Sequence, residues 1–230
     1  MKILYLSCPA KIDVIPALKK NLAKLKGYSK IALLTTAQFL PQLKNIKKLL
    51  KENNLEILIG KPKHTAIAKG QILGCDISAG LAVEKESDCF LYIGTGEFHP
   101  LGLALYTNKP ILILNPYTQI LTEISLEEKN KILKQKILKL AKLKEAKNIG
   151  ILASIKPGQY ELQEKIIPLK EKLEKQNKKV YLFVADNIAD IELQNFMFID
   201  LWINTACPRL IEDHFSKPII NAIMLKSENL

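Results

Sequence analysis

Short apolar runs alternate with stretches whose apolar residues recur at helical spacing, from residue 30 almost to the C-terminus. The runs predict two groups of buried strands, at residues 31–36, 55–59, 89–93 and 110–114, and at residues 149–154, 180–185, 199–204 and 218–222. Helices are predicted over residues 43–53, 78–86, 101–106 and 126–146. Strands that alternate with helices across short loops are typical of α/β proteins, in which helices cover both faces of a parallel sheet.

The two groups of elements correspond to each other in sequence. The strand that begins at Ile31 matches the one that begins at Ile149. Two further pairs of segments match, Tyr92-Ile93-Gly94-Thr95-Gly96 with Trp202-Ile203-Asn204-Thr205-Ala206, and Lys109-Pro110-Ile111 with Lys217-Pro218-Ile219. Such an internal repeat predicts two related parallel-sheet α/β domains, residues 29–147 and 148–230.

The N-terminal segment carries one strand and one helix. Residues 2–7 form a short apolar run, and residues 13–25 carry Ile, Leu and Val at helical spacing. Asp13 is a candidate N-cap of that helix, and Gly27 a signal for its end. Because no strand precedes this strand-helix segment in the sequence, we expect residues 1–28 to be the remnant of a third domain.

Length and hydrophobicity are those of a globular protein. The chain has 230 residues, 48% of them hydrophobic and 25% charged, and can bury a sizeable core. No apolar run reaches the roughly 18 residues that a transmembrane helix needs. The apolar stretch at the N-terminus is too short for a secretory signal, so we expect a cytoplasmic protein without a membrane segment.

The net charge of +11 raises the question of nucleic-acid binding. Much of the excess lies in helical segments such as residues 129–147, where Lys alternates with Leu and Ile, as on a solvated helix face. No aromatic residues are interleaved with these lysines as stacking platforms. We therefore expect no direct nucleic-acid binding, although a basic surface favours docking on an acidic partner.

Four widely spaced cysteines, Cys8, Cys75, Cys89 and Cys207, indicate metal binding or catalysis more than disulfides in a reducing compartment. Cys207 follows an apolar run at residues 196–203 that predicts a buried strand, and Pro208 suits the first position of a helix predicted from residue 210. A thiol at such a strand-to-helix corner favours the thiolate. Arg209, the only arginine, lies beside it. The alternative is a buried structural cysteine next to a surface arginine.

Two further loops lie where ligands of parallel sheets bind, beyond the carboxyl ends of the strands. Gly70-Gln71-Ile72-Leu73-Gly74-Cys75-Asp76 places a cysteine just ahead of a helix. Gly94-Thr95-Gly96-Glu97-Phe98-His99-Pro100-Leu101-Gly102 is a glycine-rich turn that could cradle an anion with its backbone N–H groups.

Four segments together resemble, in order and spacing, the diphthamide synthase family: 70–75, 96–102, Lys156-Pro157-Gly158-Gln159 and Asn204-Thr205-Ala206-Cys207-Pro208-Arg209. The resemblance covers nearly the whole chain. It implies the first step of diphthamide biosynthesis, in which a 3-amino-3-carboxypropyl group moves from S-adenosylmethionine to a histidine of translation elongation factor 2. It further implies three related domains, each of which gives one cysteine to a [4Fe–4S] cluster that cleaves S-adenosylmethionine reductively.

The family motifs assign candidate roles to particular residues. Cys75 and Cys207 match two of the cluster ligands. A cofactor site is implied for Gln71, Gly94, Thr95, Gly96, His99, Gln159 and Arg209, and no catalytic residue is identified. His99 is left open between a ligand, a substrate contact and a capped turn residue. Cys89 opens a buried strand and is expected in the core, and His64 and His214 are expected at the surface.

The chain departs from the family pattern at its N-terminus, where we expect most of the family's first domain and its cysteine to be missing. Three thiolates suit such a site, because an open iron then remains for substrate. The third could come from a separately encoded first-domain subunit, in a homo- or hetero-oligomer, or from Cys8. Two alternatives remain: a non-catalytic subunit that supports a homologue's cluster, and a phosphate- or nucleotide-binding protein that uses residues 94–96.

Overall fold

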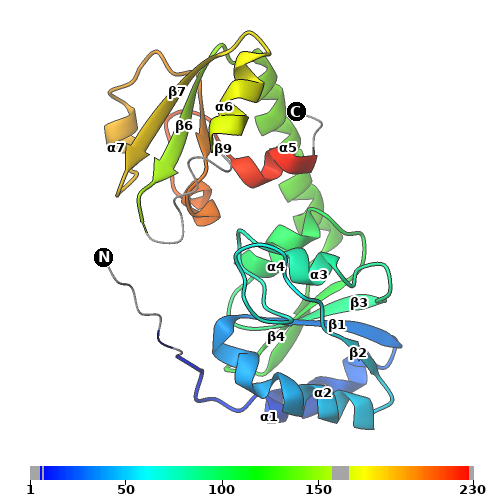
Figure 1. The fold of residues 1–230 in the computed structure, drawn as a ribbon. Coiled ribbons are helices and arrows are strands. Elements are labelled where there is room, and N and C mark those ends of the chain that lie inside the picture. The colour runs from blue at the N-terminus through cyan, green and yellow to red at the C-terminus, as the bar shows by residue number, and fades with distance from the viewer. Residues whose placement is uncertain (1–5, 7, 157–165, 228–230) are drawn as a thin grey trace. The chain divides into compact units, whose positions relative to one another are not determined.

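The computed structural model describes residues 6, 8–156 and 166–227, and its chain divides into unit 1, Met1–Asn130, and unit 2, Lys131–Leu230. Both units are open sheets covered by helices (Figure 1). Within the described ranges, no helix combines the length and the apolar character that crossing a bilayer requires. The predicted strand at residues 2–7 falls outside the described residues, except for Leu6.

The sheet of unit 1 has the strand order β2-β1-β3-β4-β5. Its four parallel strands are β1 (Lys30–Thr35), β2 (Glu56–Leu58), β3 (Cys89–Ile93) and β4 (Ile111–Asn115), as predicted to within two residues at each end. The fifth, β5 (Ile120–Glu123), pairs antiparallel with β4 and was not predicted. Its four residues include only one buried side chain, Leu121, so the sequence carries little apolar signal there.

Helices cover both faces of this sheet (Figure 1). On one face, α1 (Ile15–Asn21) and α2 (Leu43–Glu52) pack against alternate strand residues such as Ile31 and Leu33. On the other, α3 (Ser78–Leu81) and α4 (Phe98–Ala104) pack against the residues between them. Two 3₁₀ helices, η1 (Leu22–Leu25) and η2 (Ala37–Gln42), extend α1 and precede α2. Successive residues of β1 and β3 are thus buried on alternate faces, as in a strand covered on both faces.

Residues predicted as a separate remnant contribute to the core of unit 1. The helix predicted over residues 13–25 is α1 followed by η1, and Asp13 Oδ1 accepts a hydrogen bond from Ile15 N at 3.0 Å. Val14, Leu18 and Leu25 are fully buried in the core that contains β1 and β3. The assignment of residues 1–28 to a third domain therefore stays a prediction about origin.

The predicted helix at residues 78–86 is too long, because α3 ends at Leu81. The chain then enters turns in which the carbonyl oxygens of Glu84, Lys85 and Ser87 accept hydrogen bonds from the Lys109 ammonium. A side chain distant in sequence thus takes carbonyls that a longer helix would have used internally.

Unit 2 contains a fully parallel sheet with the order β7-β6-β8-β9. Its strands are β6 (Asn148–Ser154), β7 (Lys179–Ala185), β8 (Leu201–Asn204) and β9 (Ile219–Asn221). The remaining elements are α5 (Leu126–Glu145), which runs across the boundary between the units, α6 (Ile167–Glu174), α7 (Asp190–Leu193), and the 3₁₀ helices η4 (Pro208–Glu212) and η5 (Ala222–Ser227). The helix predicted from residue 210 is therefore the 3₁₀ helix η4.

The apolar run at residues 196–203 was predicted as one strand, but β8 begins only at Leu201. Met197 is 84% exposed and Phe198 50% exposed, in a turn before the strand. The carbonyl oxygens of Phe196, Met197 and Ile199 accept hydrogen bonds from Lys217 Nζ at 3.2, 2.6 and 2.6 Å. Lys217 thus holds this turn as Lys109 holds the equivalent turn of unit 1.

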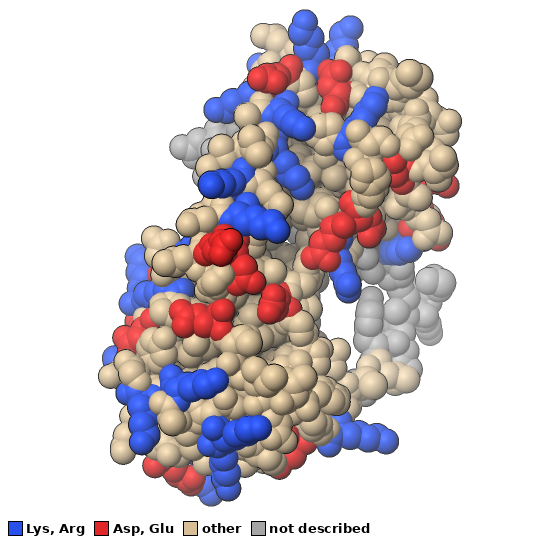
Figure 2. All heavy atoms as spheres, turned by 180° about the vertical axis from the view of Figure 1, so that it is seen from behind, with Lys and Arg blue, Asp and Glu red and all other residues tan. Residues whose placement is uncertain are grey.

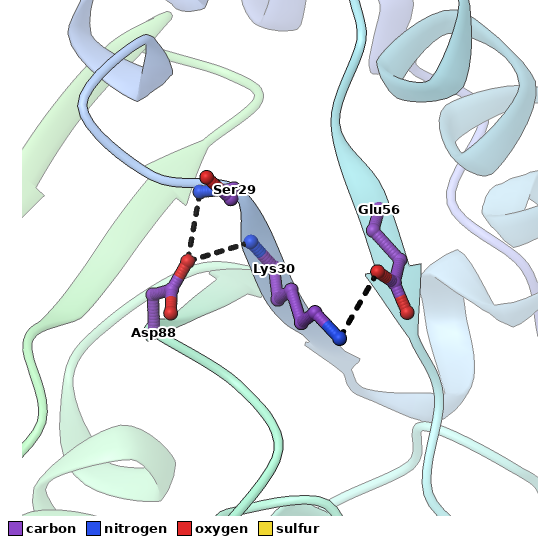
Figure 3. A network of polar contacts seen from close by, with 4 residues as sticks. All are labelled: Ser29, Lys30, Glu56 and Asp88. Carbon is purple, nitrogen blue, oxygen red and sulfur yellow. Dashed lines mark hydrogen bonds and ion pairs between the residues drawn. The ribbon is translucent and has the colours of Figure 1, made fainter.

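Equivalent contacts occur before the strands of the two units. Asp88 Oδ2 accepts the backbone N–H groups of Ser29 and Lys30 at 2.8 and 2.7 Å, and Lys30 also pairs with Glu56 (Figure 3). Asp200 does the same for residues 147 and 148, at 2.9 and 2.7 Å. Hydrogen bonds from backbone N–H donors to a charged carboxylate fix the start of β1 and of β6 in their sheets.

The strand registers correct one predicted correspondence. Ile31 pairs with Cys89, and Ile149 pairs with Leu201, so these two pairs are equivalent. It follows that Tyr92 is equivalent to Asn204, two residues away from the predicted match with Trp202. The predicted match aligned the loop residues Gly94-Thr95-Gly96 with Asn204-Thr205-Ala206, and the strands could not correct it. Tyr92 and Ile93 of β3 and Trp202 and Ile203 of β8 are all buried and apolar, without an alternation that would fix the register.

Charged side chains are spread over the surface. Figure 2 shows Lys and Arg side chains scattered among acidic and uncharged areas on the face that it presents. Most lysines of α5 are exposed, as a solvated helix face predicts. The expectation of no direct nucleic-acid binding remains a prediction.

Candidate functional site

Cys75 lies at the tip of a tight turn in unit 1. Leu73 N donates to Asp76 O at 2.8 Å, and Asp76 N donates to Leu73 O at 3.1 Å, which leaves Gly74 and Cys75 between them. Cys75 is exposed, whereas its neighbour Asp76 is only 1% exposed. The turn therefore presents a thiol to solvent from a fixed base.

The Asp76 carboxylate anchors that base. Its Oδ2 accepts Ala66 N at 2.8 Å, and its Oδ1 accepts the backbone N and the hydroxyl of Ser78 at 3.0 and 2.5 Å. Burial favours the neutral acid, but the Ser78 hydroxyl, the two backbone N–H groups and the nearby His64 outweigh it, so the pKa of Asp76 is lowered. Asp76 thus stays ionised while it holds the loop on both sides of Cys75.

The cysteine turn is also fastened to the carboxyl end of β1. Thr35 N donates to Gly70 O at 2.8 Å, and Ile72 N donates to Thr35 O at 2.9 Å. Gln71, a predicted cofactor contact, is 6% exposed, and its Oε1 accepts the N–H groups of Ile67 and Ala68 at 3.1 and 3.2 Å. The amide oxygen of Gln71 therefore holds the backbone of residues 67 and 68.

The glycine-rich turn after β3 lies beside the cysteine turn. A Cβ on Gly74 would lie 2.2 Å from Cε1 of Phe98, so the ring of Phe98 packs directly on the Gly74 backbone. Thr95 and Gly96 are exposed, and Gly96 has a positive φ of 78° with open space around it. Two of the predicted loops, one from the chain before α3 and one after β3, are therefore joined by Phe98.

His99 follows Phe98 in the first turn of α4 and is half-buried. Its Nδ1 lies 3.5 Å from the hydroxyl of Tyr92, and the two rings stack with centroids 6.3 Å apart. Tyr92 is fully buried, and burial raises the pKa of its phenol. The hydroxyl thus remains protonated, and His99 is held between Tyr92 and the edge of Phe98.

In unit 2, Cys207 lies between β8 and η4, with Pro208 in the first turn of η4 as predicted. Cys207 is exposed, so it is not the buried cysteine of the alternative interpretation. Its carbonyl oxygen accepts Asn204 Nδ2 at 2.9 Å and Leu210 N at 3.0 Å. The thiol is therefore carried by backbone that is bonded to the end of β8.

Arg209 points along the surface. Its Nε lies 3.4 Å from Glu212 Oε2, and the two side chains are 73% and 50% exposed. An exposed pair of this kind contributes little to stability. The guanidinium therefore remains accessible near Cys207.

The remaining cysteines and histidines differ in solvent exposure. Cys8 is exposed, whereas Cys89 is fully buried, and burial raises the pKa of its thiol to about 12. His64 and His214 are exposed, as expected. Gln159 lies outside the described residues. Within residues 6, 8–156 and 166–227, no three His, Cys, Asp or Glu side chains gather as metal ligands.

Sequence reasoning missed the groups that hold the cysteine loops. Asp76 has a local signal, since an Asp two residues before a Ser suits a side-chain turn at a helix start. Asn221, which donates to Pro208 O at 2.8 Å, has none, because its partner lies 13 residues earlier and is reached only through the pairing of β8 with β9.

The donor set fits an iron–sulfur cluster in its chemistry. Such clusters are held by cysteine thiolates, and exposed thiols on hydrogen-bonded turns can take part without unfolding a core. Cys75 and Cys207 meet that condition, and Cys89 does not, because a buried thiol with a raised pKa is a poor ligand.

The fold and these loops define an α/β protein with two parallel-dominated sheets that presents cysteine thiols beyond the carboxyl ends of its strands. Residues 1–226 match the family model described as "Putative diphthamide synthesis protein". The chain belongs to this diphthamide synthesis family.

Individual relatives agree with that membership. The 2-(3-amino-3-carboxypropyl)histidine synthase of Pyrococcus horikoshii is 34% identical over 217 residues, which are 92% of this chain and 60% of that protein. Subunit 1 of the Yarrowia lipolytica synthase is 29% identical over 229 residues, 96% of this chain and 50% of that protein. The chain thus spans 50% to 60% of the length of these curated relatives.

The fold is also that of a solved relative. The crystal structure of Dph2 from Pyrococcus horikoshii with a 4Fe-4S cluster matches with a TM-score of 0.82 and 31% identity, over 96% of this chain and 64% of that one. That homologue contains the kind of cluster that the family resemblance implies.

Proposed function

We propose that this chain is a transferase, or a subunit of one, for the first step of diphthamide biosynthesis. It would act in the cytoplasm and move a 3-amino-3-carboxypropyl group from S-adenosylmethionine to a histidine of translation elongation factor 2. The observation that carries the proposal is the pair of exposed thiols, Cys75 and Cys207, each on a hydrogen-bonded turn of a chain in this family.

Cys75 and Cys207 would hold a [4Fe–4S] cluster as thiolates. When bound, and once reduced by an external electron donor, this group would supply the electron that cleaves a carbon–sulfur bond of S-adenosylmethionine. The chain itself would present its thiols without rearrangement, because the turns that carry Cys75 and Cys207 are held by hydrogen bonds. Asp76 holds the first turn and Asn204 the second.

The cofactor would be bound by the loops next to these cysteines. Thr95 and Gly96 offer an exposed turn, with His99 at its end. Arg209, accessible beside Cys207, suits a carboxylate such as that of the methionyl group, because its guanidinium donates two parallel hydrogen bonds. Gln71 and Gln159 complete the proposed contacts.

Anaerobic reconstitution with iron and sulfide tests the proposal. Iron content and the visible absorbance of the cluster are measured first. Release of methylthioadenosine is then measured after S-adenosylmethionine, unmodified elongation factor 2 and dithionite, as the one-electron reductant, are added. Cys75→Ser and Cys207→Ser should each lower iron binding, whereas Cys89→Ala, a core position, should keep it. A folded wild-type chain that binds no iron, either alone or with the partner subunit that co-purifies with it, would refute the proposal and favour the nucleotide-binding alternative for residues 94–96.

Iron without methylthioadenosine would instead support the second candidate, a non-catalytic subunit that serves a homologue's cluster. The relative named subunit 1 motivates that candidate, because its name implies a multi-subunit synthase.

A third thiolate would come from Cys8, which is exposed, or from a partner subunit in a homo- or hetero-oligomer. Cys8→Ala separates these sources. Unchanged iron content would eliminate Cys8, and co-purification of a small cysteine-bearing subunit would support the other source.

A further inference from the structure

Two buried asparagines hold the backbone of three consecutive residues around Cys207. Ala206 N donates to Asn204 Oδ1 at 3.0 Å, and Asn204 Nδ2 donates to Cys207 O at 2.9 Å. Asn221 Nδ2 donates to Pro208 O at 2.8 Å. The residue before the cysteine, the cysteine itself and the residue after it are each tied to an asparagine side chain.

The two asparagines also bind each other. They face one another in the parallel register of β8 and β9, and Asn204 Nδ2 donates to Asn221 Oδ1 at 2.7 Å. Asn204 is 2% exposed and Asn221 4% exposed. Both N–H groups of Asn204 have acceptors, and both oxygens accept, so the network is satisfied. A satisfied buried network is rigid, and removal of one member leaves buried groups unpaired.

This network is not part of the repeated scaffold. In unit 1 the position equivalent to Asn204 is Tyr92, whose hydroxyl lies near His99 instead of holding a cysteine loop. The asparagine pair therefore belongs to the loop of Cys207 and is not a general requirement of this sheet.

We propose that Asn204 and Asn221 are positioning residues for the Cys207 thiolate. They hold the backbone on both sides of Cys207, so its sulfur is presented to iron without ordering a loop at the moment of binding. Groups that orient a metal ligand in this way affect metal retention strongly although they do not touch the metal. The inference rests on the proposed function, since it needs Cys207 to be a ligand.

The test compares Asn204→Ala and Asn221→Ala with a matched control, Asn21→Ala. Asn21 is 6% exposed and donates to the carbonyl oxygens of Ala17 and Gln119, both at 2.9 Å, in unit 1. All three variants lose buried amide hydrogen bonds, but only the first two lose bonds around Cys207.

Two quantities are measured on the full chain. The rate at which the reconstituted protein loses iron to a chelator should rise about 10- to 100-fold in Asn204→Ala and Asn221→Ala and stay at the wild-type value in Asn21→Ala. In the iron-free protein, amide hydrogen exchange over residues 204–212 and alkylation of Cys207 should be faster in the first two variants alone. Asn221→Ala keeps the test available if Asn204→Ala does not fold.

The outcomes separate the two proposals. A wild-type chain without iron overturns the proposed function, and this inference with it. Iron retention in both variants equal to wild type, with faster exchange around Cys207, overturns the positioning role alone. Equal iron loss in Asn21→Ala also overturns it, because general destabilisation would then be the cause.

Discussion

Replacement of Gly74 by Ala tests the packing that joins the Cys75 turn to the glycine-rich turn. The added Cβ would lie 2.2 Å from Cε1 and 2.7 Å from Cζ of Phe98. Carbon atoms in contact are about 3.5–4.0 Å apart, so the ring must move by more than about 1 Å. Phe98 is half-buried and can yield partly toward solvent. Overpacking of this kind costs about 1–3 kcal/mol.

The double variant isolates the cause. Phe98→Ala removes the obstacle, so Gly74→Ala in that background should cost less than about 0.5 kcal/mol, as expected when a coupled pair is removed together. Gly27→Ala is the matched control: nothing lies within 4 Å of its added Cβ. At such a site the substitution should leave stability unchanged or raise it by about 0.4–1 kcal/mol.

Urea unfolding followed by far-ultraviolet circular dichroism gives these free energies. The single tryptophan, Trp202, lies in the core of unit 2, so its fluorescence does not report directly on unit 1. If Gly74→Ala were equally destabilising with and without Phe98, the clash with that ring would not be its cause, and the proposed packing of the two turns would be wrong.

Three further predictions concern charge and burial. The pKa of Asp76 is lowered in the folded state, so the stabilisation from its carboxylate is present above the unfolded pKa of about 3.9 and is lost as pH falls through the folded pKa. Asp76→Asn should therefore make the melting temperature depend less on pH in acid. A pH dependence equal to that of the wild type would contradict this. Lys217→Met should lower the free energy of unfolding by about 2 kcal/mol, because three carbonyl oxygens lose a charged donor. Urea unfolding should show a similar loss for Lys109→Met and little change for the exposed control Lys48→Met. Iodoacetamide should label the three exposed cysteines of the native iron-free chain but not Cys89, whose burial raises its pKa to about 12; mass spectrometry showing rapid labelling of Cys89 would refute its place in the core.

Much of the fold could be predicted because its signals are local. Parallel strands appear as unbroken apolar runs, and eight strands of the described residues lie where those runs occur, although β7 at the sheet edge exposes much of its side chains. Strand β5 was missed because only one of its residues is buried. The limits of α3 and β8 were wrong because Lys109 and Lys217 bind carbonyls more than 15 residues away, which no local pattern reveals.

The candidate site divides in the same way. Cysteines in loops after strands could be anticipated from residue type and position, and Cys89 is buried as expected. The exposure of Cys207 was left open by the sequence, and the structure shows it exposed. The groups that hold those loops could not. Asn221 meets Pro208 only because β9 pairs with β8, and Phe98 meets Gly74 only because α4 packs beside the cysteine turn.

The repeated contacts and the divergent ones lie at opposite ends of the strands. Before the strands, Asp88 and Asp200 bind equivalent backbone N–H groups, and Lys109 and Lys217 bind equivalent carbonyls. Toward their carboxyl ends, β3 has Tyr92 where β8 has Asn204. A scaffold that is secured at one end leaves the other free to differ, as ligand sites of parallel sheets require. Equivalent substitutions before the strands should therefore lower the free energy of unfolding to a similar extent in either unit. Substitutions at the carboxyl ends should instead affect only the cysteine loop that the replaced residue holds.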